Sequence, residues 1–137
     1  MRSSATMLPR NSILVVDDDD LERRSICETL SREGYEAVGV ENGVRAMLLI
    51  KSSLPPALIL LDLLMPEKDG FTVIYELRCN SKLALIPIVV ISGAGEQQAL
   101  EHAGIAGYLP KPFNRDELLE VVARFARRAA PTRGVRI

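Results

Sequence analysis

Five polar side chains follow short apolar runs of the sequence, and their types suit a site that handles phosphate and a divalent cation. They are Asp17, Asp18, Asp62, Ser92 and Lys111. Three neighbouring carboxylates repel one another, by roughly 4 kcal/mol for a pair 4 Å apart at an effective dielectric constant of about 20. Such a group therefore takes up protons or binds a cation. Mg²⁺ suits an open site of oxygen ligands, and an ammonium and a hydroxyl group beside it could hold phosphoryl oxygens. This set of groups is the equipment for forming an aspartyl phosphate.

The elements that would bring these residues together alternate regularly along the chain. Three apolar runs are short, continuous and aliphatic, which is typical of strands buried on both faces of a parallel sheet. Two others are weaker and more mixed, as edge strands are, and Pro110 suits an edge because it has no N–H group for the ladder. The three strong runs are 13–16, 58–61 and 86–91, and the two weak ones are 35–40 and 106–109.

Helical periodicity fills the intervals between these runs. It is clearest near the end, where apolar residues recur at i, i+3, i+4 and i+7 from Leu118. Asn114 and Glu117 form the pattern of a capping box at the start of that helix. The N-caps expected for the other helices are Asp19 or Asp20, Asn42 and Asp69, and the glycines expected to close helices are Gly34 and Gly104.

The alternation predicts an α/β fold of the (βα)₅ type, in which helices cover both faces of a five-stranded parallel sheet. With right-handed crossovers, a doubly wound sheet in strand order 2-1-3-4-5, as in flavodoxin-like folds, is the natural packing. Ligands of such sheets bind at the carboxyl ends of the strands, where the polar residues fall. We expect one domain at 12–128, a flexible N-terminal segment at 1–11 and a basic C-terminal tail at 129–137.

Composition narrows the class of protein. The 137 residues are 47% hydrophobic and 26% charged, which suits a single globular domain. The formal net charge of -1 gives no reason to expect nucleic-acid binding by the domain itself. The first twelve residues lack the apolar core of a signal peptide, and no apolar stretch approaches the length of a membrane span. We therefore expect a cytoplasmic protein that does not associate with membranes.

Four motifs, in order, resemble those of bacterial response-regulator receiver domains of two-component systems, such as the chemotaxis regulators. The resemblance covers about residues 12 to 128. The motifs are ILVVDDD at 13–19, LDLLMPEKDG at 61–70, ISG at 91–93 and YLPKPF at 108–113.

The resemblance implies a phosphoacceptor and a metal site. Asp62 is implied as the residue that is phosphorylated. Mg²⁺, or Mn²⁺ in its place, would be held by Asp18, Asp62 and the backbone carbonyl of Leu64, with Asp17 acting through a bound water. The domain would then be a switch that assists its own phosphorylation and dephosphorylation, and not a conventional enzyme.

The resemblance also implies a response to the phosphoryl group. Ser92 and Lys111 would contact it, and Ser92 with Tyr108 would form the switch pair that alters a partner-binding surface. The Lys111–Pro112 peptide bond would be cis. The implied partners are a sensor histidine kinase or histidine phosphotransfer protein and a downstream protein target or effector domain, and the resemblance also allows a dimer.

Two features depart from the pattern of the family. The stretch between Ser92 and Lys111 is short, which predicts a truncated fourth helix and puts a standard dimer in doubt. Leu64 occupies a position that is polar in some receiver domains, which suggests slow loss of the phosphoryl group. An unchanged hydrolysis rate in Leu64→Asn would exclude that explanation.

Other functions fit the same residues less well. A haloacid-dehalogenase-like phosphatase would use Asp17 as nucleophile and Asp19 as acid–base. However, Leu21 stands where that family has Thr or Val, and the motif around Asp62 would be left without a role. A receiver-like module that binds partners without phosphorylation usually lacks an acidic or lysine position, and none is missing here. Taken alone, Tyr108 could also be a packed edge-strand residue.

Overall fold

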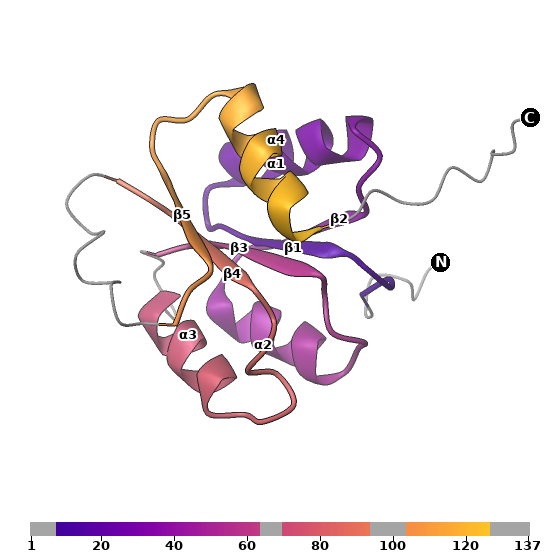
Figure 1. Ribbon diagram of the computed structural model, residues 1–137, viewed down its shortest axis with the longest axis vertical. Coiled ribbons are helices and arrows are strands. Elements are labelled where there is room, and N and C mark those ends of the chain that lie inside the picture. The colour runs from indigo at the N-terminus through magenta and orange to yellow at the C-terminus, as the bar shows by residue number, and fades with distance from the viewer. Residues whose placement is uncertain (1–7, 64–69, 94–103, 127–137) are drawn as a thin grey trace, which may run out of the picture.

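The computed structural model, which describes residues 8–63, 70–93 and 104–126, contains an open sheet of five parallel strands. Their order is β2-β1-β3-β4-β5, which confirms the predicted doubly wound topology (Figure 1). The strands are β1 (Ile13–Val16), β2 (Ala37–Val40), β3 (Leu58–Asp62), β4 (Ile88–Ser92) and β5 (Gly107–Pro110). The helices are α1 (Asp20–Arg32), α2 (Gly43–Lys51), α3 (Gly70–Arg78) and α4 (Arg115–Phe125). The predicted helix between β4 and β5, and its truncation, fall outside the described residues.

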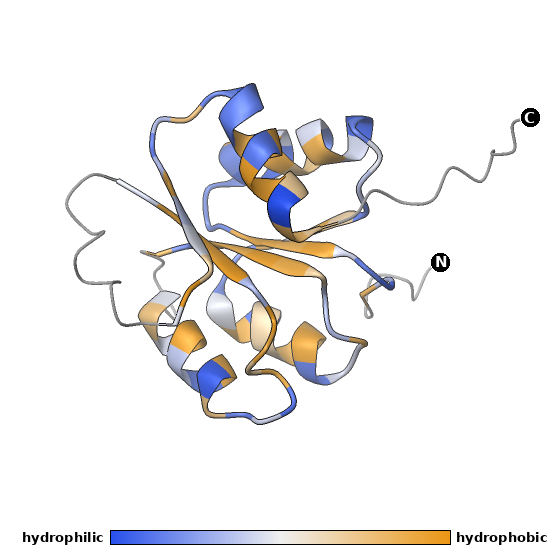
Figure 2. Cartoon of the chain, in the orientation of Figure 1, coloured by the Kyte–Doolittle hydropathy of each residue, from blue (hydrophilic) through white to orange (hydrophobic). Residues whose placement is uncertain are grey.

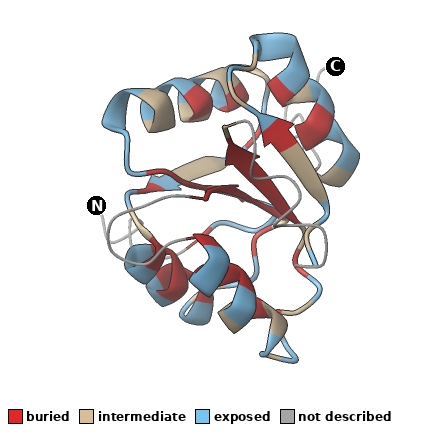
Figure 3. Ribbon diagram, turned by 90° about the vertical axis from the view of Figure 1, so that its left-hand side faces the viewer, coloured by how far each residue is buried: buried red, intermediate tan, exposed pale blue. Residues whose placement is uncertain are grey.

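Helices cover both faces of the sheet, as the continuous apolar strands require. Figure 1 shows α1 and α4 on one face and α2 and α3 on the other. Along β1, Leu14 and Val16 pack in the core on the α2–α3 side, whereas Ile13 and Val15 pack on the α1–α4 side. The apolar strands are enclosed by half-polar helices in Figure 2, and the inner strands are buried in Figure 3. Burial of each Leu or Ile contributes about 1.5–3 kcal/mol to the stability of the fold that positions the site.

Side-chain caps begin three of the helices where the sequence predicted them. Asp19, and not Asp20, caps α1, because its carboxylate accepts from the Glu22 N–H group at 3.0 Å. Asn42 caps α2 by accepting from the Arg45 N–H group at 2.9 Å. The capping box predicted for the last helix, now α4, is present in full. The predicted cap of α3, Asp69, lies outside the described residues.

Arg78 joins the end of α3 to two segments that precede strands. Its guanidinium donates to the carbonyl oxygens of Gly104 at 2.7 Å, Ala84 at 2.8 Å and Ile86 at 3.3 Å. Gly34, which follows α1, has φ 92°, the left-handed conformation that closes helices, as predicted. Gly104 has φ 76°, but the helix that it is predicted to close lies outside the described residues. The three hydrogen bonds of Arg78 hold the segments before β4 and β5 against the end of α3.

Of the segment predicted to be flexible, 1–11, the structure describes residues 8–11. Leu8 is buried in the core on the α2–α3 side, and its N–H group donates to the Ser53 hydroxyl at 2.9 Å. Leu8 thus packs with the domain although it precedes the predicted boundary at 12, because its apolar side chain enters the core on the α2–α3 side. In the part of the chain that the structure describes, no helix has the length and apolar character to cross a membrane.

Candidate metal centre

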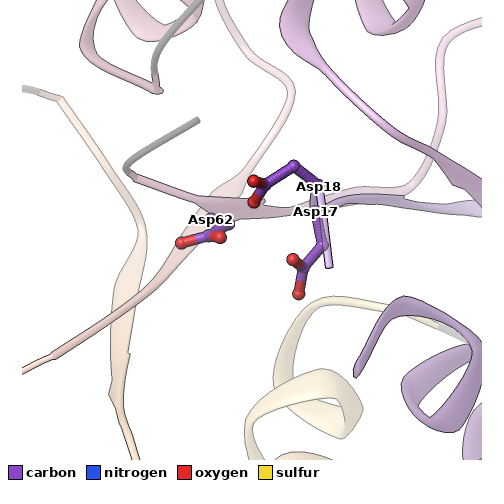
Figure 4. Close-up of side chains that lie close together, drawn as sticks. All are labelled: Asp17, Asp18 and Asp62. Carbon is purple, nitrogen blue, oxygen red and sulfur yellow. The ribbon is translucent and has the colours of Figure 1, made fainter. Parts of the chain in front are cut away.

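Three carboxylates meet at the carboxyl ends of β1 and β3. β1 and β3 are parallel neighbours with Val16 opposite Leu61, so the residues that follow lie side by side. One carboxylate oxygen from each of Asp17, Asp18 and Asp62 lies within 4.8 Å of the others (Figure 4). Asp17 and Asp62 are buried, whereas Asp18 is exposed. The structure therefore confirms that folding gathers the three predicted carboxylates.

Asp17 carries a buried oxygen atom without a donor. Its Oδ1 accepts from the Asp19 N–H group at 2.9 Å, but Oδ2 has no hydrogen-bond partner among the described residues. Burial, followed by the closeness of the Glu22 carboxyl group, raises the pKa of Asp17 to about 8. A buried carboxylate with a vacant lone pair requires a proton or a cation. Asp17 is thus suited to face a hydrated metal ion.

Burial and neighbouring charges shift the pKa of Asp62 in opposite directions. Burial raises the pKa of its carboxyl group, the Lys111 ammonium group lowers it, and the charges of Asp18 and Glu22 raise it again, with an upward shift as the net result. A divalent cation would reverse this shift, because it favours the ionised carboxylates. Hard oxygen donors on an open edge of the sheet fit Mg²⁺ better than softer transition metals.

Lys111 extends from the end of β5 into the acidic group. Its Nζ lies 3.6 Å from Asp62 Oδ1 and 3.1 Å from Glu22 Oε1. Burial by itself would lower the pKa of Lys111, but the carboxylates of Glu22 and Asp62 outweigh it and raise that pKa. The Lys111–Pro112 bond is cis, as the resemblance implies. The predicted approach of Lys111 to Asp62 is confirmed.

Glu22 is a member of the site that the sequence analysis missed. It lies in the first turn of α1, and its carboxylate contacts the ammonium group of Lys111 and faces Asp17. The cap at Asp19 gave a usable signal, because the residue three positions after a cap lies at the helix end that faces the strand termini. Asp19, the acid–base of the alternative phosphatase hypothesis, caps α1 through one carboxylate oxygen.

Ser92 ends β4, and Tyr108 lies on the neighbouring strand β5, opposite Val90. Ser92 is buried at the last position of β4, and its carbonyl accepts from the Lys111 N–H group at 2.8 Å. The Tyr108 hydroxyl donates to the carbonyl oxygen of Gly93 at 2.7 Å. The two predicted switch residues are therefore linked through the backbone after β4. Leu64, whose carbonyl is the third implied metal ligand, lies outside the described residues.

Comparison with known proteins connects this geometry to one family. The family model of the response regulator receiver domain matches residues 13–123. Response regulator MprA of Mycobacterium sp. (strain KMS) is 38% identical over 123 residues, which are 89% of this chain and 53% of that protein. The chain thus spans about half the length of the curated relatives it matches.

Two solved structures share the fold. A response regulator receiver protein from Pseudomonas putida has a TM-score of 0.77 at 30% identity, with 85% of this chain and 98% of that chain covered. The Vibrio cholerae chemotaxis protein CheY4 has a TM-score of 0.75 at 27% identity, with 86% and 98% covered.

Proposed function

The chain belongs to the response regulator receiver family, and on that premise we propose that it is a Mg²⁺-dependent switch phosphorylated on Asp62. The observation that carries the proposal is the position of Asp62, which lies beside two further carboxylates and 3.6 Å from the ammonium group of Lys111. An acceptor carboxylate needs positive charge close by, because the incoming phosphoryl group is negatively charged.

Each residue of the site has a defined part in this proposal. Asp18, Asp62 and the carbonyl of Leu64 would hold Mg²⁺, with Asp17 acting through a water. The ion, when bound, neutralises negative charge on the carboxylates and on phosphoryl oxygens. An oxygen of the Asp62 carboxylate attacks phosphorus as the bond from phosphorus to the donor breaks, and the donor leaves with the electron pair. Lys111 supplies the remaining positive charge at the phosphoryl oxygens.

The output of the switch involves Ser92 and Tyr108. A phosphoryl oxygen would draw the Ser92 hydroxyl toward it, and the backbone after β4 would move with it. Because the Tyr108 hydroxyl is bonded to the Gly93 carbonyl, that movement changes the environment of Tyr108 and the surface around β5. The donor would be a sensor histidine kinase or histidine phosphotransfer protein, and a downstream protein or effector domain would recognise the altered surface. We place this exchange in the cytoplasm.

Intact-mass spectrometry tests the proposal directly. The protein is incubated with acetyl phosphate, with Mg²⁺ or with EDTA, and so are the variants Asp62→Asn and Asp116→Asn. Asp116 is the matched control, because its side chain is 92% exposed on α4. We expect a gain of one phosphoryl group in the wild type and in Asp116→Asn, only with Mg²⁺, and none in Asp62→Asn. Metal-independent modification, or modification of Asp62→Asn, would contradict the proposal.

A further inference from the structure

The ammonium group of Lys111 lies between two carboxylates and is closer to the one that is not the acceptor. It is 3.1 Å from Glu22 Oε1, within hydrogen-bond distance, and 3.6 Å from Asp62 Oδ1. The Lys111 and Glu22 side chains are each about one-third exposed, so water weakens their attraction without removing it. In the unphosphorylated domain, Glu22 therefore competes with Asp62 for Lys111.

The position of Glu22 is set by its helix. Its N–H group is fixed by the Asp19 cap, so the start of its side chain has little freedom. The first turn of α1 also contains Asp20, but that carboxylate is 69% exposed and pairs with Arg23 at 2.6 Å. Glu22 instead lines one groove with Lys111 and Pro112. Stabilisation of the helix end would not require this orientation.

The charge of the site makes the competition consequential. Three aspartates, one lysine and one divalent ion sum to zero. Glu22 adds a negative charge that engages the only ammonium group that the described residues place against Asp62. We infer that Glu22 is a positioning residue that holds Lys111 away from Asp62 and thereby slows phosphorylation. This inference rests on the proposed function of Asp62.

The phosphorylation rate of a Glu22 variant tests the inference. We expect Glu22→Gln to be phosphorylated by acetyl phosphate about fivefold faster than wild type at saturating Mg²⁺, since a partly exposed ion pair shifts an equilibrium by up to about that factor. Glu28→Gln is the matched control, because Glu28 lies on the same helix and pairs with Arg32 at 3.4 Å on its exposed surface. The control should keep the wild-type rate. An unchanged or lower rate in Glu22→Gln would overturn the inference.

The variant Glu22→Asp distinguishes the effect of the contact with Lys111 from the effect of the negative charge. In Glu22→Asp the negative charge remains, but the side chain loses one methylene group and no longer reaches Lys111. We expect this variant to be phosphorylated faster than wild type as well. If Glu22→Gln were faster and Glu22→Asp were not, general charge would explain the rate and the positioning role would fail.

A double-mutant cycle shows whether Glu22 acts through Lys111. In a Lys111→Ala background, Glu22→Gln should leave the residual phosphorylation rate unchanged, because the restrained group is absent. The same acceleration in that background would overturn the inference.

Binding gives a readout that does not depend on phosphorylation. Beryllofluoride, a tetrahedral analogue of the phosphoryl group, should bind the Mg²⁺-loaded Glu22→Gln protein about fivefold more tightly than wild type by ¹⁹F NMR. Equal affinities of the two proteins for beryllofluoride would contradict the inference that Glu22 holds Lys111 away from Asp62. The two proposals fail separately: no phosphorylation of the wild type refutes the function of Asp62, whereas normal phosphorylation with an unaltered Glu22→Gln rate refutes only the role of Glu22.

Discussion

In the absence of a metal ion, the free energy of unfolding should fall as the pH rises from 5 to 8, because of Asp17. Its pKa is about 8 in the folded protein and 3.8 as the ordinary value. Between these pH values the folded state keeps a proton that the unfolded chain has released. The folded state therefore binds more protons than the unfolded state, and stability declines with pH. Above pH 8 both states have lost the proton and the decline ends.

The size of this effect follows from one proton. A full proton of difference corresponds to about 1.4 kcal/mol for each pH unit, which sets an upper limit of about 4 kcal/mol between pH 5 and 8. A domain of this kind has a free energy of unfolding of roughly 5–15 kcal/mol, so the decline is large enough to measure. Saturating Mg²⁺ should flatten the dependence, because a cation stabilises the ionised carboxylate.

The assay is urea unfolding followed by circular dichroism at pH 5, 6, 7 and 8 in EDTA. Wild type is compared with Asp17→Asn, whose side chain has the same shape and no titration. All other groups titrate in both proteins, so the difference between their unfolding free energies isolates Asp17. As the pH rises, we expect the free energy of unfolding of Asp17→Asn to increase relative to that of the wild type. The free energy of unfolding of Asp116→Asn should change with pH as that of the wild type does. Parallel curves for wild type and Asp17→Asn would show that Asp17 is ionised throughout and refute the reasoning.

Three further substitutions test contacts around the site by urea unfolding. In Gly70→Ala, the added Cβ would lie 2.8 Å from the Cα of Leu63, so we expect the free energy of unfolding to fall by about 1–3 kcal/mol. Mg²⁺ binding measured by calorimetry should also weaken, and wild-type values for both quantities would contradict this prediction. In Arg78→Ala, three carbonyls lose their charged donor, and we expect a loss of about 2 kcal/mol, against less than about 0.5 kcal/mol for the exposed control Arg32→Ala. In Tyr108→Phe, loss of the bond at 2.7 Å should cost about 1 kcal/mol, and an unchanged midpoint would mean that the hydroxyl contributes nothing.

The sequence by itself determined the fold and most of the site. A run such as Leu58–Leu61 has no polar face, so both of its faces must be covered, and a parallel, doubly wound sheet with five such units satisfies this requirement. The polar residues at the ends of the runs then share one edge of the sheet. For this reason the sequence alone groups Asp17, Asp18, Asp62 and Lys111 at one site. The helix caps could also be predicted from the sequence, because each cap depends on residues only three positions apart.

Only the tertiary structure decided which side chains compete within the site. The pair Glu22 and Lys111 is separated by most of the chain, and helical periodicity indicates which face a residue occupies but not which partner it reaches. Burial of Leu8 and the three contacts of Arg78 were hidden for the same reason. The protonation of Asp17 was also undetermined, since its pKa depends on how completely the surrounding elements exclude water. Local patterns specify elements, whereas distances between side chains and the dielectric environment exist only once those elements have packed.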